Sequence, residues 1–408
     1  MANNDLNEDW LRYRHWDLPY RSLEQLVRRH FGIEDLDRVA EIRARLLEFV
    51  QLPVWWPAPA ELKEEVARFL YRHEGRGQRP AEQTFPCPGI HPDLRPPYHL
   101  TEAFMLDSLR GLALGDAFGQ LWFAVRPLEL GRQRVAERWL PSTDGPWRWT
   151  DDTAMAIDVV RELKARATLE PASLLRRFGA TYQREAWRGY GDGMHELLNQ
   201  LRLYPREVGK QLQLAAELYG GEGSLGNGAA MRAGPIGACY VSERDIDIDK
   251  VLYNAYTSAG TTHRHPDGMA GSVAVAVAAG LAAVSRSLSR PKLGFMFQFV
   301  AEHTPPGQVR DQLVRIASVP SWADPWEVAQ EFGSGRGARA DNTVPFAIWT
   351  AFHHLGDLTE ALWATVAGFG DSDTTCAITG SIVAARTGLA GVDPRWLELL
   401  EPLPEDLC

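Results

Sequence analysis

Two short acidic motifs, far apart in the sequence, hold the residues of this chain best suited to chemistry. Residues 149–153 (WTDDT) and 370–375 (GDSDTT) each place two carboxylates beside a threonine hydroxyl, at the start of a predicted helix. If the two helix starts face each other, four carboxylates converge, and their repulsion is tolerable only with cations between them. Ligands that are all oxygen favour magnesium or manganese over zinc or copper. The pair of motifs therefore predicts a two-metal site.

Each motif also has a plainer interpretation as a helix cap. Thr and Asp side chains accept hydrogen bonds from the unpaired N–H groups of a first helical turn, and they suit the positive end of the helix dipole. For one motif alone, helix capping is enough to explain the presence of Thr and Asp residues. The sequence has two such motifs, and Gly370 leaves the approach to the second free of side-chain bulk. Together they favour the metal site.

Three further segments are candidates for ligand binding. Residues 111–119 (GLALGDAFG) end a predicted helix and are interpreted first as helix packing with an aspartate cap at Asp116. Residues 225–232 (LGNGAAMR) enter another helix, where backbone amides could cradle a diphosphate or simply form a tight entry. Residues 262–266 (THRHP) hold two histidines without a nearby cysteine, so zinc is not predicted. Each segment in isolation leaves structure and binding open.

The composition is that of an ordinary globular protein. Among 408 residues, 45% are hydrophobic and 24% are charged, and the net charge is -10. This charge argues against nucleic-acid binding, which needs a basic surface. The four cysteines show no C-x-x-C spacing, and the first residues do not resemble a signal peptide. The longest apolar run, Ser272–Val284, is too short to span a bilayer, so we expect no membrane partner and a cytoplasmic location.

The elements that must position these motifs are predicted to be helices. Apolar residues recur at helical spacing in segments such as Ala103–Gly115, Asp152–Ala165 and Thr375–Thr387, whereas alternating strand patterns are nearly absent. Residues 1–75 carry helical patterns too, and residues 76–98 are rich in proline, as is typical of a linker. We therefore predict an all-α protein with a helical N-terminal extension (1–75), a linker (76–98) and a catalytic domain (99–408).

Taken in order, the motifs resemble those of the ADP-ribosylglycohydrolase family, also called the ADP-ribosylhydrolase family. The resemblance covers about residues 100–395 and rests on residues 111–119, 147–156, 188–191, 226–237, 262–266 and 370–380. It implies an orthogonal helical bundle with two Mg²⁺ ions in a cleft, Mn²⁺ being the alternative. The metal ligands that it implies are Thr150, Asp151, Asp152, Asp371, Asp373 and Thr374.

The resemblance also implies a site for ADP-ribose. The diphosphate and ribose would lie along Gly226, Asn227, Gly228, Ala229, Met231 and Arg232. The same ligand would be contacted by Asp116, Tyr190, Gly191 and His263. One position departs from the family pattern: many members carry a glutamate four residues after Gly119, where it gates or binds the metal, and this chain has Phe123 there. The role of that glutamate is therefore not transferred.

These residues support hydrolysis of a glycosidic bond. Paired divalent ions, typically about 3.5–4 Å apart, orient hydroxyls and activate water. Nearby carboxylates stabilise the oxocarbenium-like state formed at the anomeric carbon. The candidate catalytic residues are Asp151, Asp152 and Asp373, one of which would be the general base toward water. The predicted activity is removal of ADP-ribose from a modified protein side chain, with arginine as the expected residue.

The sequence also allows two other functions. The N-terminal extension, with Trp55 and Trp56 beside prolines, could clamp a partner such as an ADP-ribosyltransferase toxin, which would make the chain an immunity-type binding protein. The same extension could instead pack on the catalytic domain. A metal-binding scaffold without activity is disfavoured because all six implied ligands are present.

Overall fold

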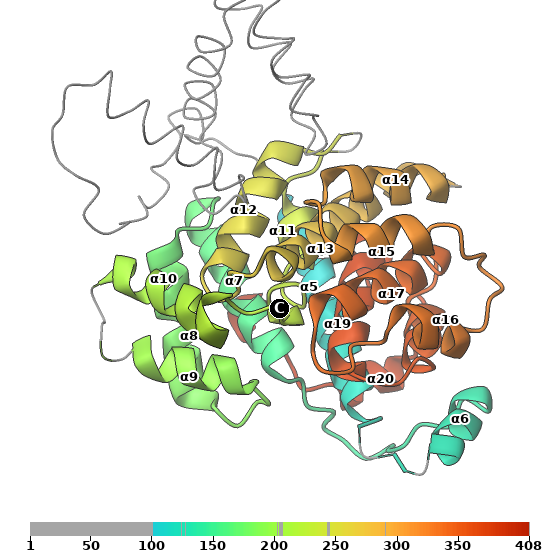
Figure 1. Ribbon diagram of the computed structural model, residues 1–408. Coiled ribbons are helices and arrows are strands. Elements are labelled where there is room, and N and C mark those ends of the chain that lie inside the picture. The colour runs from blue at the N-terminus through green and yellow to red at the C-terminus, as the bar shows by residue number, and fades with distance from the viewer. Residues whose placement is uncertain are drawn as a thin grey trace, which may run out of the picture. The chain divides into compact units, whose positions relative to one another are not determined.

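The computed structural model describes residues 101–407 except positions 124, 127, 202, 204–206, 243–244 and 290. The predicted extension (1–75) and linker (76–98) lie outside the described residues. Within those residues the chain forms helices and loops with a few isolated bridges and no β-strand, which confirms the all-α prediction. Figure 1 shows α5, α13 and α19 in the interior, with the other helices around them.

The α-helices have the following bounds: α5 Glu102–Gln120, α6 Leu128–Ala136, α7 Asp151–Arg166, α8 Pro171–Glu185, α9 Asp192–Leu201, α10 Val208–Glu217, α11 Gly234–Cys239, α12 Ile248–Gly260, α13 Pro266–Val284, α14 Leu293–His303, α15 Gln308–Ile316, α16 Pro325–Phe332, α17 Ala340–His353, α18 Leu358–Val366, α19 Ser372–Thr387 and α20 Pro394–Leu399. Short 3-10 turns span Leu218–Gly221, Asn227–Ala229, Ser285–Ser287 and Glu405–Leu407. Both acidic motifs begin helices, α7 and α19, as the sequence predicted.

The glycines of residues 111–119 lie inside α5, which continues beyond the predicted end at Gly115 to Gln120. They recur every four residues and therefore share one face of the helix. A Cβ atom at Gly111 would overlap Ala384, one at Gly115 would overlap the Cys376 carbonyl, and one at Gly119 would overlap the Ser372 carbonyl. The packing interpretation of this segment is thus confirmed. The stripe brings α5 against α19, and Asp116 follows directly after its middle glycine.

Helix α13 is nearly all apolar and crosses the interior. With its 3-10 continuation it forms a segment, Pro266–Ser287, that by length and composition is able to cross a membrane. The sequence analysis considered only Ser272–Val284, so the expectation that the run is too short is corrected. In the fold, 94% of the apolar window is buried, which is the environment of a core helix.

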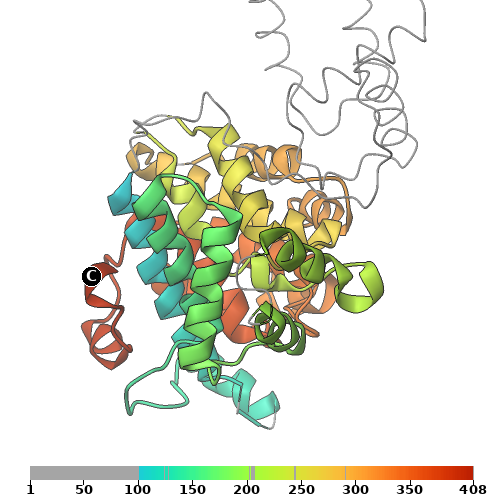
Figure 2. The same ribbon diagram turned by 90° about the vertical axis from the view of Figure 1, so that its left-hand side faces the viewer.

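The chain entering α7 is held in place by the C-terminal segment. Trp147 donates its backbone N–H to the Leu399 carbonyl at 2.6 Å and accepts from the Glu401 N–H at 2.9 Å. The Trp147 and Trp396 rings lie 5.7 Å apart, centroid to centroid. Figure 2 shows α5 and α7 side by side, with the C-terminal end at one edge of the bundle. Residues close to the end of the chain therefore fix the approach to the first acidic motif.

Arg188 adds a second anchor at the same place. Its guanidinium lies 3.5 Å from the Trp149 ring centroid and donates to the Trp149 carbonyl at 2.9 Å. It also forms two hydrogen bonds with the Glu401 carboxylate, at 2.7 and 2.8 Å. The Arg188 carbonyl accepts the backbone N–H of Asp151 at 3.0 Å. This buried arginine thus connects the C-terminal segment to the first residue of α7.

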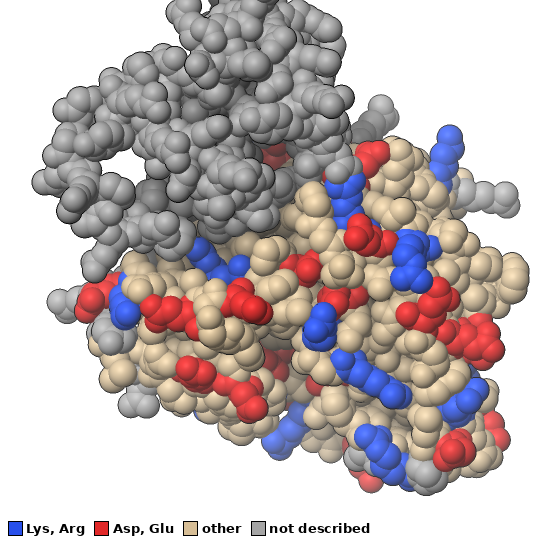
Figure 3. Space-filling model, viewed as in Figure 1, with Lys and Arg blue, Asp and Glu red and all other residues tan. Residues whose placement is uncertain are grey.

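Charged side chains of both signs are distributed over the surface. On the face shown in Figure 3, lysines and arginines alternate with aspartates and glutamates across the described part of the chain. The described part of this face therefore carries charges of both signs.

Candidate metal and ligand site

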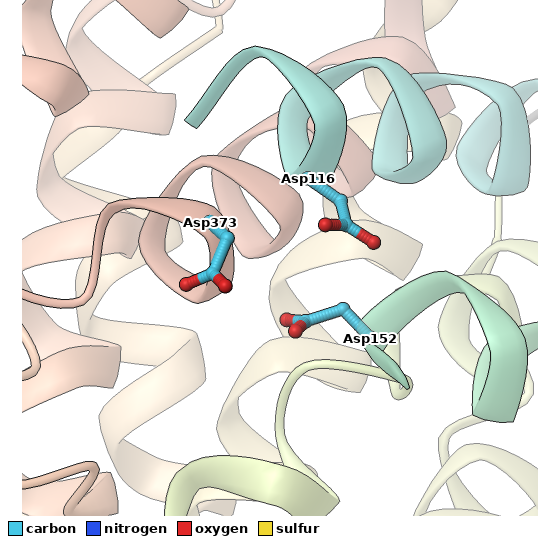
Figure 4. Close-up of side chains that lie close together, drawn as sticks. All are labelled: Asp116, Asp152 and Asp373. Carbon is cyan, nitrogen blue, oxygen red and sulfur yellow. The ribbon is translucent and has the colours of Figure 1, made fainter. Parts of the chain in front are cut away.

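Three helices bring their carboxylates to one point. Asp116 of α5, Asp152 of α7 and Asp373 of α19 each offer an oxygen atom, and these oxygens lie within 4.8 Å of one another. Figure 4 shows the three side chains directed into the space between the helices. The convergence of the two acidic motifs, which the sequence analysis made conditional on the fold, is therefore present. Its third member, Asp116, comes from the glycine-rich face of α5.

Asp116 holds the N-terminus of α7 in place through hydrogen bonds. Its carboxylate accepts from the Thr150 backbone N–H at 2.9 Å and from the Thr150 hydroxyl at 2.9 Å. It also accepts from the Thr153 N–H at 3.1 Å and the Thr153 hydroxyl at 2.6 Å. The two backbone N–H groups are donors that a first helical turn leaves without an intrahelical acceptor. The sequence analysis assigned Asp116 to the ADP-ribose pocket, whereas the structure places it among the carboxylates, where it orients the first motif.

In the first motif, the residues that cap α7 also belong to the carboxylate cluster. Thr150 is the N-cap of α7, with its hydroxyl accepting from the Asp152 N–H at 3.4 Å and lying 3.0 Å from Asp152 Oδ2. The other carboxylate oxygen of Asp152, Oδ1, is buried and has no hydrogen-bond partner. A buried charged oxygen without a partner is costly unless a cation meets it. Asp151 lies at the edge of the cluster, where its Oδ1 faces Gly189.

The second motif meets the first from the opposite side. The Thr374 hydroxyl donates to Asp152 Oδ2 at 3.4 Å, and its backbone N–H donates to Asp373 Oδ1 at 2.7 Å. Asp371 is not one of the three carboxylates that converge, but its charge acts on its neighbour Asp373. Its Oδ2 accepts from the Asn227 side-chain amide at 2.7 Å. Asp371 thereby links the second motif to the 225–232 loop.

Burial changes the acidity of the whole cluster. It raises the pKa of Asp116 to about 6, against the hydrogen bonds from Thr153 and Thr150, which lower it. Burial, then the charge of Asp116, raise the pKa of Asp151 to about 7. Burial and the neighbouring carboxylates raise the pKa of Asp152 and of Asp373 well above the usual value. Near neutral pH such a cluster holds either protons or a cation in their place.

The donor set fits a hard divalent cation. All the donor atoms are carboxylate or hydroxyl oxygens, and an orphaned buried oxygen of Asp152 faces the cluster. Asp152 and Asp373 are the residues best placed to hold it, with Asp151, Asp371, Thr150 and Thr374 around them. Asp116 already accepts hydrogen bonds from Thr150 and Thr153, so its role is to fix the position of the first turn of α7.

The 225–232 loop forms a 3-10 turn, Asn227–Ala229, and α11 begins only at Gly234. The backbone N–H groups of Ala230 and Met231 both donate to the Asn227 carbonyl, at 2.8 and 3.0 Å. Of the amides expected to cradle a diphosphate, these two are therefore used within the turn. Ala229 and Met231 are buried, whereas Gly226 and Gly228 are half-buried.

Arg232 does not face a ligand. It is fully buried, and its N–H groups donate to the Gly228 carbonyl, the Ser258 carbonyl and hydroxyl, the Thr262 hydroxyl and the sulfur of Met155. Five acceptors occupy the five donors of a guanidinium. Burial lowers the pKa of Arg232 to about 9. The prediction that Arg232 contacts the ligand is therefore wrong. Arg232 instead stabilises the loop from the protein interior, through its hydrogen bond to the Gly228 carbonyl.

His263 lies directly under the two glycines of the loop. Its Nδ1 is 2.7 Å from the Thr262 hydroxyl, and a Cβ atom at Gly228 would approach its Cε1 to 2.9 Å. Burial, then the nearby Arg232 charge, lower the pKa of His263 to about 3, so the imidazole is neutral. A side chain at Gly228 would therefore press against this histidine, and one at Gly226 would lie 3.1 Å from its Nε2.

Tyr190 and Gly191 lie at the entrance to α9. Tyr190 is buried, its ring packs edge-on against Tyr182 at 5.2 Å between centroids, and its hydroxyl has no partner. Burial, then the charge of Asp151, raise the pKa of Tyr190, so the phenol stays protonated. The Gly191 carbonyl accepts the N–H groups of Met194 and His195 at the start of the helix. Tyr190 thus lies near Asp151, whereas Gly191 begins the next element.

The sequence analysis missed the loop of residues 333–337 (GSGRG). The Ser334 carbonyl accepts the Asp371 N–H at 2.9 Å, and Gly335, at φ +85°, packs against the Cβ of Asp371. Gly333 and Gly337 also have positive φ, at +93° and +82°. Three glycines in five residues, a pattern typical of a tight loop, were the available signal. This loop positions the second motif.

The fold and the site together define an all-helical domain with a buried oxygen-donor site at the ends of three helices. A family model described as ADP-ribosylglycohydrolase matches residues 101–408. The chain therefore belongs to the ADP-ribosylglycohydrolase family, and it is an enzyme of the glycohydrolase class. The resemblance identified from the motifs is confirmed.

Similar proteins support the same assignment. ADP-ribosylhydrolase ARH3 of Homo sapiens is 29% identical, over 73% of this chain and 89% of that protein. ADP-ribosylhydrolase ARH3 of Bos taurus is 27% identical, over 73% and 88%. A solved structure titled ADP-ribosylglycohydrolase-related protein complex matches with a TM-score of 0.50 and 22% identity, covering 74% of this chain and 93% of that chain. That likeness supports the orthogonal-bundle fold.

Proposed function

We propose that the chain is a dimagnesium-dependent hydrolase that removes ADP-ribose from a modified protein side chain, with Mn²⁺ able to replace Mg²⁺. The modified residue that we propose is arginine, and the bond cleaved is the glycosidic bond at the anomeric carbon of the ribose. The observation that carries the proposal is the meeting of two distant acidic motifs around the unpartnered Oδ1 of Asp152.

The residues around the cluster have separable tasks. Paired divalent ions would supply orientation of the ribose hydroxyls and a water of lowered pKa. Asp116 and Thr150 hold the first turn of α7, and Asn227 holds Asp371, so the carboxylates are oriented before substrate arrives. Asp151, Asp152 and Asp373 stabilise positive charge at the anomeric carbon, and one of the three accepts the proton of the attacking water.

Removing one carboxylate tests the metal dependence. Asp373→Ala and Asp151→Ala should each reduce turnover at least about a hundredfold, because the loss of one preorganised charge is not replaced by the others. The fold should survive, since repulsion among the remaining carboxylates falls. Asp144→Ala, in an exposed loop, is the control for loss of one negative charge. Near wild-type turnover by either cluster variant in chelator-treated buffer would reject the mechanism.

The identity of the modified residue needs a substrate panel. Peptides carrying ADP-ribose on arginine or on serine, together with ADP-ribosylated thymidine, should be incubated with the protein and Mg²⁺, and released ADP-ribose measured. We expect the arginine conjugate to be cleaved fastest. Preferential cleavage of another conjugate would retain the hydrolase and reject arginine.

A further inference from the structure

A cavity of about 610 Å³ opens beside the carboxylate cluster. Its walls come from the segment after α5, with Trp122, Phe123 and Arg126, from residues 335–338, and from residues 369–372. Asp371 of the second acidic motif lines it, whereas Asp116, Asp152 and Asp373 are not among its lining residues. The cavity therefore adjoins the second acidic motif.

The 335–338 wall is shared with the 225–232 loop. The Ala338 carbonyl accepts the Asn227 backbone N–H at 2.9 Å, and Ala338 also lines the cavity. Asn227 in turn binds Asp371 through its side chain at 2.7 Å. If ADP-ribose occupies the 225–232 loop, the cavity is a second space in contact with Asp371. This is where a group attached to the ribose through the bond to be cleaved would extend.

The lining combines aromatic surface with positive charge. Phe123 is 39% exposed, and Trp122 and Phe369 complete an apolar wall. Arg126 and Arg336 are both exposed at the cavity, and neither forms an ion pair with a residue that the structure describes. Arg336 stands between Gly335 and Gly337, whose positive φ values set the turn that presents it. A guanidinium binds a carboxylate through two parallel hydrogen bonds.

We propose that this cavity is the leaving-group subsite and that Arg126 and Arg336 select polypeptide substrates with an acidic residue next to the modified side chain. The inference rests on the proposed function. Aromatic walls accept the stem of the modified residue and the adjacent backbone, while the two arginines bind the flanking carboxylate. Phe123, at the position where many family members have glutamate, leaves this flank of Asp371 free of a competing negative charge.

Two matched substrates test the selection. They are ADP-ribosylated peptides that differ only in an Asp or an Asn on each side of the modified residue. With the full chain and Mg²⁺, we expect kcat/KM to be about tenfold higher for the Asp peptide, as for a charge-assisted pair at a partly exposed site. The Arg126→Gln/Arg336→Gln double variant should cleave both peptides equally and bind free ADP-ribose with unchanged affinity.

Arg134→Gln is the control, because it removes the same charge from α6, outside this cavity, and should keep the preference. Equal cleavage of both peptides by the wild type would overturn the inference and leave the hydrolase intact. A loss of ADP-ribose affinity in the double variant would assign the arginines to the diphosphate, which also overturns it. If the wild type cleaves neither peptide nor any other ADP-ribosylated substrate, the proposed function itself fails.

Discussion

Buried carboxylates in this protein have two kinds of surroundings. Asp152 and Asp373 face other carboxylates, so a cation can replace the protons that burial makes them hold. Asp158, farther along α7, is also buried and has an unpartnered Oδ2, but arginines rather than carboxylates lie around it. Burial raises its pKa to about 6, against a hydrogen bond from Thr181 and the charges of nearby arginines, which lower it.

The raised pKa of Asp158 should make the stability of the protein depend on pH. Because its folded pKa lies above the unfolded value, the folded state holds the proton more tightly, and the free energy of unfolding falls as pH rises from about 4 through 6. The variant Asp158→Asn lacks this titration. Its stability relative to wild type should therefore increase by roughly 2 kcal/mol between pH 4 and pH 8. Urea unfolding at several pH values measures the difference.

Asp144→Asn, an exposed loop position, serves as the comparison and should show a flat difference across the same pH range. Since the acidic cluster titrates in both the wild type and Asp158→Asn, its contribution cancels when the two are subtracted. A flat difference for Asp158→Asn as well would show that the Asp158 carboxylate is solvated in the folded protein.

At the scale of elements, the close approach of α5 and α19 determines whether the site exists. One helix carries Asp116 and the other begins at the second motif, and the glycine stripe lets their backbones touch. Interiors are packed so densely that an added methyl group has no room without backbone shifts. The spacing of the carboxylates is therefore set by residues that carry no side chain.

Gly115→Ala tests this packing. The added Cβ would overlap the Cys376 carbonyl, and we expect the free energy of unfolding to fall by at least about 2 kcal/mol, with weaker metal binding. Gly179→Ala is the matched control, because Gly179 lies inside α8 with nothing within 4 Å of the added atom. Helix propensity predicts that the control gains about 0.5–1 kcal/mol. Similar effects of the two substitutions would refute the packing argument.

The C-terminal segment is the second element on which the site depends. In Arg188→Met, the carboxylate of Glu401 loses its partner, and the indole of Trp149 loses the stacked guanidinium. We expect a loss of roughly 3 kcal/mol of stability, as for other broken buried pairs, and a higher metal concentration for half-maximal activity. Arg395→Met, at an exposed pair with Asp393, should leave both quantities unchanged. Thermal unfolding and a metal titration of activity distinguish the two variants.

In the whole molecule, the site residues that the structure describes all lie after position 100, and the family model begins at residue 101. We expect a chain beginning at Tyr98 to fold, to bind metal and to hydrolyse a small ADP-ribosylated substrate. Thr101 would be retained, and its backbone N–H donates to the Cys239 carbonyl at 2.9 Å. The shortened chain should lose efficiency on a protein substrate while keeping it on the small one, which comparing kcat/KM for the two would show.

Insolubility of that shortened chain, or its inactivity on the small substrate, would make residues 1–98 part of the catalytic core. The partner-clamp hypothesis would then fail. The immunity function against an ADP-ribosyltransferase toxin stays a prediction that concerns residues outside the described part of the structure. Direct binding of such a toxin to the full chain, compared with the chain beginning at Tyr98, would test it.

The helical fold and both acidic motifs can be predicted from the amino-acid sequence. Helical periodicity and capping residues are local signals, so α7 and α19 begin where the motifs predict. The order of the motifs was also sufficient to identify the family. Each motif is a run of neighbouring residues, and the order of the motifs is read along the chain, so neither requires knowledge of what packs against them.

The role of each polar side chain, by contrast, depends on contacts between segments that are distant in the sequence. From the sequence, Asp116 could be a helix cap or a ligand contact. The packing of α5 against α7 and α19 brings its carboxylate to those of Asp152 and Asp373. Arg232 looked suited to a diphosphate, but acceptors up to 77 residues away along the chain occupy its donors. The 333–337 loop matters because it packs on Asp371. Such roles depend on which atoms meet across the fold, and burial then sets their charge, so no local pattern encodes them.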